Sequence, residues 1–309
     1  MATIEGTPGN DHIIIDAETG AGPHTVRAYT GVDVIEIDIY ARTDVYLEDG
    51  GDTVRGGDGT DSIHFNGAAN RLYGGGGNDE FTSGTVGDGN LIDGGDGTDT
   101  FRAGGTAAFI NLAEGRGAFR DGSGELRHAE LRDLETLQGT TGNDILVGDD
   151  DANTIHGWIG HDLLSGGGGD DILTSDDWIS SSGNDIFVGG LGADDITTAN
   201  GDDVIRIDRL VESLPGQEDR VTDFSSRDIL DLSRIDADQT AAGDQAFTLI
   251  GDAPFSYTAG ELHYQQLGRG LLVSADADGD GRSDMQLILE PTWYQGQALT
   301  RLTADDVLL

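Results

Sequence analysis

The apolar positions of this chain recur with a period of nine residues over two stretches, each two residues after an Asp or Asn. The first stretch places them at Ile63, Leu72, Phe81, Ile92 and Phe101. The second places them at Leu146, Ile155, Leu164, Leu173, Phe187, Ile196 and Ile205. This period predicts a repeat architecture in which one side chain per repeat points inward and stacks on its neighbours in a thin core.

The polar positions keep the same register, because the sixth residue of every repeat is Asp or Asn. These residues are Asp61, Asn70, Asp79, Asn90 and Asp99, and then Asp144, Asn153, Asp162, Asp171, Asp185, Asp194 and Asp203. The clearest repeats, such as Gly56-Gly-Asp-Gly-Thr-Asp-Ser-Ile-His64, read Gly-Gly-x-Gly-x-Asp-x-apolar-x. The glycines permit a tight turn with positive φ angles. Carboxylate and main-chain carbonyl oxygens in such a turn are the ligands that Ca²⁺ prefers.

These nonapeptides resemble the calcium-binding repeats of RTX (repeats-in-toxin) proteins. The resemblance implies an all-β fold, a right-handed parallel β-roll in which six residues turn, three form a strand and two repeats complete one coil. It also implies several bound Ca²⁺ ions, held at the glycine turns and the sixth-position carboxylates: Gly57, Gly59, Asp61, Gly75, Gly77, Asp79, Gly95, Gly97, Asp99, Asp144, Asp162, Gly167, Gly169, Asp171, Asp185, Gly190, Gly192, Asp194 and Asp203.

Turns that lie two repeats apart should stack along one edge of the roll. In the first array we therefore expect calcium along the edge of Asp61, Asp79 and Asp99, and a neutral, hydrogen-bonded ladder along the edge of Asn70 and Asn90. In the second array we expect metal on both edges. One edge carries Asp144, Asp162, Asp185 and Asp203, and the other carries Asn153, Asp171 and Asp194.

The repeats divide the chain into four expected segments. Residues 1–103 form a first roll, whose initial 55 residues look like decayed repeats, and residues 139–206 form the second. Between them, residues 104–138 interrupt the period and favour a structural joint over a site. Phe109–Gly115 predicts a strand and a turn, and Leu126–Leu137 is the best helix candidate in the chain. Residues 207–309 form the fourth segment.

The fourth segment resembles, from Arg220–Leu232 onward, the C-terminal domain of serralysin-type proteins, which implies a β domain that caps the roll. It contains a loop with acidic residues at positions one, three, five and nine and Gly at six, which matches the start of a calcium loop. Position twelve is Leu287 instead of Glu, so the loop is a weaker calcium site or only a tight acidic turn. Its acidic residues are Asp276, Asp278, Asp280 and Asp284.

The amino-acid composition limits the kinds of partner that the chain can bind. The chain carries 58 acidic and 17 basic residues, a net charge of −41, with no Lys and no Cys. This charge repels nucleic acid and anionic membranes, and no apolar run is long enough to span a bilayer. The N-terminus lacks the pattern of a signal peptide, and Leu302–Leu309 resembles the C-terminal signal of type I secretion substrates. We therefore expect export by type I secretion machinery to the extracellular space. Adaptation to high salt would explain the large number of acidic residues, but not their fixed position in the repeats.

Catalytic motifs are missing from the sequence. The seven His residues form no His-Glu-x-x-His motif, and there is no Gly-x-Ser-x-Gly elbow. The expected function is a secreted, non-catalytic calcium-binding protein whose repeats fold on binding Ca²⁺. One alternative is a module that binds polysaccharide or a cell surface through Trp158 or Trp178. A less favoured one is an enzyme, a protease or a polysaccharide-modifying enzyme, with an unrecognised site.

Overall fold

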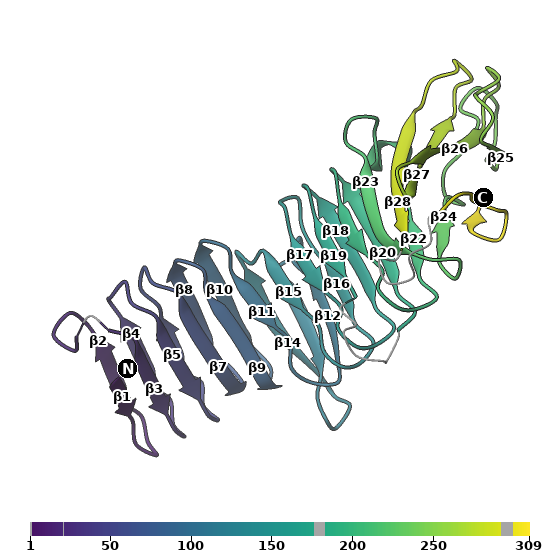
Figure 1. The fold of residues 1–309 in the computed structure, drawn as a ribbon. Helices are drawn as coiled ribbons and strands as arrows, with labels where there is room; N and C mark the ends of the chain where they lie inside the picture. Colours follow the sequence, from purple (N-terminus) through teal and green to yellow (C-terminus); the bar gives the residue numbers. More distant parts are fainter. Residues whose placement is uncertain (1, 21, 176–182, 292–298) are drawn as a thin grey trace. The chain divides into compact units, whose positions relative to one another are not determined.

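The computed structural model describes residues 2–20, 22–175, 183–291 and 299–309 and divides into two compact units, Met1–Val147 and Gly148–Leu309. Both units are built from β-strands (Figure 1). Within the described ranges the only helix is a single 3-10 turn, η1 (Leu210–Glu212). This confirms the all-β prediction. Each unit contains two sheets in which successive coils pair mostly in parallel.

The strands of the first unit alternate between its two sheets, except that three consecutive strands of the insert lie in the same sheet. One sheet contains, in spatial order, β1 (Ala2–Glu5), β3 (His24–Ala28), β5 (Thr43–Leu47), β7 (Asp61–Gly67), β9 (Glu80–Val86), β11 (Thr100–Arg102) and β15 (Thr136–Gln138). The other contains β2 (His12–Ile15), β4 (Val34–Ile37), β6 (Thr53–Arg55), β8 (Arg71–Gly76), β10 (Asn90–Asp96), β14 (Leu126–Arg132), β13 (Arg116–Arg120), β12 (Ala107–Asn111) and β16 (Ile145–Val147). The decayed repeats before residue 56 therefore continue the same two sheets.

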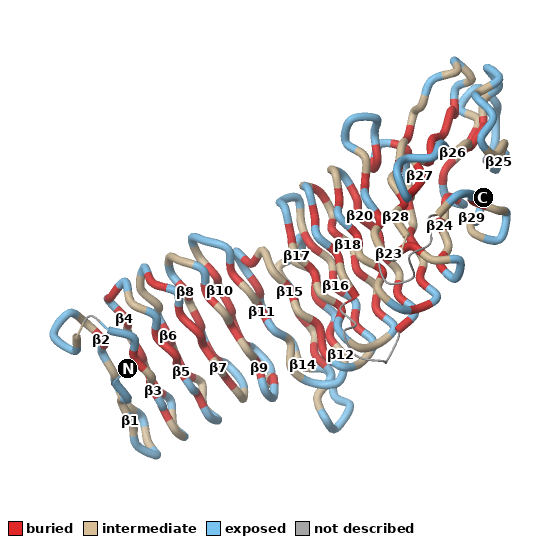
Figure 2. Tube along the Cα trace, viewed as in Figure 1, coloured by how far each residue is buried: buried red, intermediate tan, exposed pale blue. Residues whose placement is uncertain are grey.

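The predicted apolar positions form the core of both units. Ile63 pairs in register with Val45 on one side and Phe81 on the other, so that all three side chains stack inward. Every one of the twelve apolar repeat positions is fully buried. Figure 2 shows this as buried stripes that run from strand to strand. The side chains that flank these positions are more exposed in most repeats, as Arg71 and Tyr73 are on either side of Leu72.

The prediction of a helix over Leu126–Leu137 is wrong. Leu126–Arg132 forms strand β14, and Thr136–Gln138 forms strand β15. In β14 the side chains alternate, with Ala129 and Leu131 buried between exposed neighbours. Pairing with β10 on one side and β13 on the other overrides the helical spacing of the leucines. The strand and turn predicted from Phe109 are confirmed by β12 and the turn that follows it.

The second unit begins with the same two-sheet coil. One sheet contains β17 (Thr154–His156), β19 (Ile172–Thr174), β21 (Asp195–Thr197), β23 (Asp219–Phe224), β28 (Met285–Pro291), β27 (Gly270–Asp276), β26 (Glu261–Leu267) and β25 (Thr248–Gly251). The other contains β18 (Leu163–Gly168), β20 (Ile186–Leu191), β22 (Val204–Arg206), β24 (Ile229–Asp231) and β29 (Val307–Leu308). Strands after residue 207 pair with the last strands of the array, β21 and β22, as expected of a cap.

Candidate metal centre

The sixth-position side chains form hydrogen-bonded ladders along the edges of the coils. In the first unit, Asp61 donates its N–H to Asp79 Oδ1 at 2.7 Å, and Asp79 donates its N–H to Asp99 Oδ1 at 2.7 Å. The second unit repeats this from Asp171 to Asp194 at 2.8 Å. Each sixth-position residue is one rung of such a ladder, and it uses one carboxylate oxygen to bind the backbone of the preceding coil. These bonds are buried, and they hold successive turns in register.

The second oxygen of most rungs faces no hydrogen-bond donor in the part of the chain that the structure describes. These Oδ2 atoms are buried and belong to Asp33, Asp52, Asp79, Asp99, Asp171, Asp194, Asp203 and Asp219. A buried charged oxygen without a partner costs several kcal/mol in order of magnitude. A cation at each turn would remove that cost.

Within the glycine-rich repeats, the backbone at the second residue distinguishes the turns whose Oδ2 atom has no donor from those whose Oδ2 atom is hydrogen-bonded. Where this residue has a positive φ, as at Gly167 (111°) and Gly190 (108°), the Oδ2 atom of the repeat has no donor in the described ranges. In the repeat of Asp61 this residue, Gly57, has no positive φ, and it donates its N–H to Asp61 Oδ2 at 3.3 Å. A positive φ at the second residue means that the peptide plane between the first and second residues is flipped. The carbonyl of the first residue then takes the place of the N–H of the second residue. A carbonyl beside a carboxylate attracts cations.

The first glycine of the repeat leaves room where these oxygens converge. A Cβ atom on Gly166 would lie 2.5 Å from the carbonyl oxygen of Gly189 and closer still to Asp171 Oδ2. A Cβ atom on Gly74 would overlap Asp79 Oδ2 and the carbonyl oxygen of Gly94 in the same way. The donor set is therefore a carboxylate oxygen and a main-chain carbonyl oxygen around one small space, which fits the oxygen ligands of Ca²⁺.

Gly166→Ala should disrupt this arrangement. We expect the methyl group to displace Asp171 and the facing carbonyl, with a loss of about 1–3 kcal/mol in the free energy of unfolding in saturating calcium. Urea unfolding followed by circular dichroism measures this. The matched control is Gly122→Ala, where an added Cβ meets nothing within 4 Å. Equal stability losses in the two variants would contradict the assignment.

Burial raises the pKa of the ladder carboxyls above their usual value near 3.8. The pKa rises to about 6 for Asp52, Asp61 and Asp194 and to about 7 for Asp79 and Asp171. It reaches about 8 for Asp203 and Asp219, where a neighbouring carboxylate of the ladder adds to the effect of burial. The protein alone thus does not stabilise the charged form of these groups.

The two asparagine turns of the first unit are satisfied without a cation. Asn70 donates its N–H to Asn90 Oδ1 at 2.9 Å, which continues the ladder. The Asn90 Nδ2 group donates to the carbonyl oxygens of Gly67 at 3.1 Å and Gly87 at 2.9 Å. Amide hydrogens thus occupy the carbonyls that a cation would otherwise bind. The predicted neutral ladder is confirmed as a hydrogen-bonded structure, opposite the edge of Asp61, Asp79 and Asp99.

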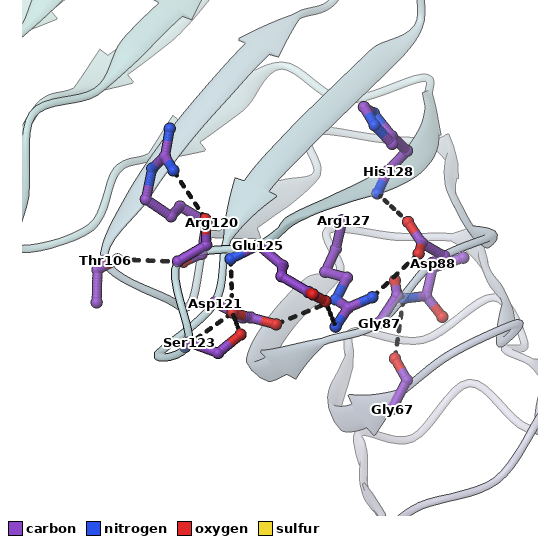
Figure 3. A network of polar contacts seen from close by, with 12 residues as sticks. Gly67, Gly87, Asp88, Thr106, Arg120, Asp121, Ser123, Glu125, Arg127 and His128 are labelled. Atoms are coloured by element: carbon purple, nitrogen blue, oxygen red, sulfur yellow. Dashed lines mark hydrogen bonds and ion pairs between the residues drawn. The ribbon is translucent and has the colours of Figure 1, made fainter.

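An arginine provides the positive charge where this edge meets the insert (Figure 3). The Arg127 guanidinium pairs with Asp88 at 3.3 Å, Asp121 at 3.1 Å and Glu125 at 2.6 Å. Hydrogen bonds from Ser123, with further donors from Glu125 and Arg127, lower the pKa of Asp121 to about 2. These surface carboxylates differ from the ladder carboxylates, because protein donors already stabilise their charge.

The acidic loop predicted near the C-terminus joins β27 to β28. Asp276, Asp278 and Asp284 each present an oxygen within 4.8 Å of the others. Asp280 lies outside this group and accepts the N–H of Arg282 at 2.8 Å. Leu287, at loop position twelve, is fully buried in β28, so no twelfth ligand is available from that residue. Three of the four predicted residues are therefore brought together.

The remaining predicted residues take several positions. In the second unit the expected edges are present, since Asp162 donates its N–H to Asp185 Oδ1 and Asp185 donates to Asp203 Oδ1, both at 2.8 Å. Asp144 accepts the N–H groups of Thr140 and Ala108 on its two oxygens. Trp158 stands at the second position of its repeat with φ 73°, partly exposed. Trp178 lies outside the described residues.

Sequence reasoning missed the rungs beyond the arrays. Asp219 accepts the N–H of Asp194 at 3.1 Å, and Asp228 accepts the N–H of Asp203 at 3.0 Å. Each is followed two residues later by a buried apolar residue, Val221 or Leu230, so the Asp-x-apolar signal was present without the glycines. Asp33 and Asp52, by contrast, belong to the decayed repeats that the sequence indicates, and they extend the asparagine edge toward the N-terminus.

Comparison with protein families identifies the repeats. The model of the RTX calcium-binding nonapeptide repeat matches four stretches, residues 46–81, 66–89, 136–173 and 175–206. The chain therefore carries RTX calcium-binding repeats, as its nonapeptides predict. Comparison with curated proteins finds no significant match. Among solved structures, the chain is similar to an extracellular lipase, LipA, from Serratia marcescens, at 16% identity and a TM-score of 0.34. That alignment covers 87% of this chain and 45% of the lipase.

Proposed function

We propose that this chain, which carries RTX calcium-binding repeats, is a secreted and non-catalytic protein whose coils fold when Ca²⁺ fills the turns. The observation that supports this most is the row of buried Oδ2 atoms that face carbonyl oxygens but no donor in the described part of the chain. Bound Ca²⁺ would supply positive charge at these oxygens. The residues that would hold it are the sixth-position aspartates together with main-chain carbonyls of the glycine turns.

Folding and calcium binding are then a single linked reaction. The unfolded chain has no preformed turn, so each ion binds the folded state and stabilises it. Without ions, the net charge of −41 opposes compaction, and 50 glycines increase the backbone entropy lost on folding. In calcium-poor cytoplasm the chain would stay expanded and pass a type I secretion channel, and calcium outside would fold it. Among the described residues, no helix is long and apolar enough to cross a membrane.

A non-catalytic role agrees with the histidines whose contacts the structure shows. His64 stacks on Tyr46 with ring centroids 4.6 Å apart and an angle of 8° between the planes. His24 is buried, and its Nε2 lies 2.9 Å from the carbonyl oxygen of Gly20. Both side chains thus contribute to the packing of the coil.

Counting bound ions tests the proposal. We expect Asp171→Asn to bind at least one Ca²⁺ fewer than the unmodified chain in native mass spectrometry, because its Oδ2 is the charged oxygen at that turn. Asp228→Asn is the matched control in the same unit, since its oxygens accept the N–H groups of Asp203 and Ser225. It should keep the full number of ions. A chain that binds no calcium, or an unchanged count in Asp171→Asn, would refute the proposal.

A further inference from the structure

A cavity of about 410 Å³ lies at the turn between β26 and β27, beside the end of β28. Small organic ligands occupy cavities of about 300–1,000 Å³, so its size suits one such molecule. It lies beyond the family matches, the last of which ends at residue 206, and none of its described residues is a sixth-position carboxylate. The described residues that line it are Arg220, Leu267, Gly268, Arg269, Glu290 and Pro291.

The charge around this cavity is opposite to that of the whole chain. Two arginines line it against one carboxylate, although the sequence has 58 acidic and 17 basic residues. A guanidinium is planar and binds a carboxylate through two parallel hydrogen bonds. The cavity therefore suits an anion, which the net charge of the chain repels elsewhere.

An ion pair across two neighbouring strands positions one of these arginines. Arg220 in β23 lies with its Nη2 atom 2.7 Å from Glu290 Oε2, in the paired strand β28. The two side chains are 48% and 28% exposed, respectively. An ion pair on the surface contributes only about 0–1 kcal/mol. A ligand carboxylate can therefore compete with Glu290 for the Arg220 guanidinium.

Apolar side chains form another part of the lining. Leu267 and Pro291 contribute to it, and the large apolar side chain of Leu267 is 47% exposed. Covering apolar surface of this kind with a ligand is favourable. A ligand with an apolar body next to its anionic group would contact both kinds of lining at once.

The turn that forms one wall of the cavity is held in place by hydrogen bonds. Gln266 Nε2 donates to the carbonyl oxygens of Gly270 at 2.8 Å and Leu299 at 3.1 Å. Leu299 in turn donates its N–H to the carbonyl oxygen of Arg269 at 2.9 Å. Gly270 packs so closely on β28 that a Cβ atom there would overlap the carbonyl oxygen of Leu289. The wall thus exists before a ligand binds, which lowers the entropy cost of binding.

We propose that this cavity binds a small organic anion, a carboxylate joined to an apolar body. The carboxylate of the ligand would lie at Arg220 and Arg269. Its apolar body would lie against Leu267 and Pro291. Glu290 then acts as a competitor that limits the affinity. This site goes beyond the proposed function, because it takes an anion and contains no glycine turn of the repeats.

Isothermal calorimetry with octanoate, on the full chain folded in millimolar calcium, tests the site. We expect one octanoate to bind, and Arg220→Gln to weaken its binding on the order of tenfold, because a hydrogen bond to a charged group is lost. Arg227→Gln is the matched control, because Arg227 pairs with Asp202 at 3.5 Å elsewhere in the same unit, with its side chain 59% exposed. It should bind octanoate like the unmodified chain.

Two related compounds separate the contributions of charge and apolar surface. Octanamide keeps the apolar body without the charge, and acetate keeps the carboxylate without the apolar body. Each should bind at least on the order of tenfold more weakly than octanoate. If octanamide or acetate binds as well as octanoate, the ligand class is wrong.

Glu290→Gln distinguishes a ligand site from an ion pair that only supports the fold. Removing the competing carboxylate should tighten octanoate binding several-fold, whereas damage to the fold would weaken it. Circular dichroism in saturating calcium confirms that each variant is folded. The proposal is overturned if the unmodified chain does not bind octanoate, or if Arg220→Gln binds it as well as Arg227→Gln does. Unchanged or weaker binding by Glu290→Gln would overturn the role of Glu290 as a competitor.

Discussion

Calcium-free protein should show the circular dichroism of a largely disordered chain, and added millimolar calcium should restore the β spectrum. At a free concentration ten times the dissociation constant, each ion adds about 1.4 kcal/mol to the free energy of unfolding. Six to nine ions would then contribute on the order of 10 kcal/mol, which is comparable to the whole stability of a domain. The loss on removing calcium is the largest effect expected for this protein, because all the ladder carboxylates whose Oδ2 atom lacks a protein donor contribute to it.

The control for this experiment is ionic strength. Sodium chloride screens the repulsion of the −41 net charge but cannot replace a divalent ligand at a turn. If salt alone restores the β spectrum, the acidity is an adaptation to high salt and the turns are not metal sites. A calcium-free chain that keeps its β spectrum in dilute buffer would contradict metal-coupled folding altogether.

Acid should partly replace calcium. In the calcium-free fold, burial raises the pKa of Asp79 and Asp171 to about 7 and that of Asp203 and Asp219 to about 8, from 3.8. A raised pKa means that the folded state binds protons more tightly than the unfolded state. These groups therefore stabilise the fold fully below about pH 4, and this stability is lost as the pH rises toward 8. We expect the calcium-free chain to have more β structure at pH 5 than at pH 8.

The calcium-bound protein should behave in the opposite way. Ions compete with protons for the same carboxylates, so calcium affinity should increase from pH 5 to pH 8. The measurement is circular dichroism of protein freed of calcium by dialysis, with and without added calcium, across this range. A calcium-free chain whose β content rises with pH would show that the ladder carboxyls are charged and stabilised by protein groups.

The periodic part of the fold follows from the sequence because one position in nine sets the side chain that must be buried. Ile63, Phe81 and Phe101 lie where the repeat places them, and the carboxylates of Asp79 and Asp99 lie at the turns. The edges of the coil also follow, because two repeats per coil place alternate turns on opposite sides. Local sequence is sufficient where each coil contacts only its neighbours.

The interrupted parts could not be predicted in the same way. Leu126–Leu137 has helical spacing, yet its strands are set by pairing with β10 and β13, which are distant in sequence or outside the period. Glu135 enters the ladder only because a three-residue turn brings a longer side chain to the same place. Ala199, at the second position of its repeat, has a φ of 57°, although the sequence has no glycine there that would indicate a positive φ. These features depend on the assembled coil.

The hydrogen bonds of the ladder all run the same way, which gives the stack a polarity. The N–H group of each rung binds the carboxylate of the next coil toward the C-terminus, as Asp61 does to Asp79 and Asp171 does to Asp194. A fragment trimmed from its N-terminal side keeps an acceptor for every remaining donor, whereas one trimmed from its C-terminal side loses the acceptor of its last coil. Folding of the stack should therefore begin at the C-terminal coils of each unit, because these coils hold the acceptors for the coils before them.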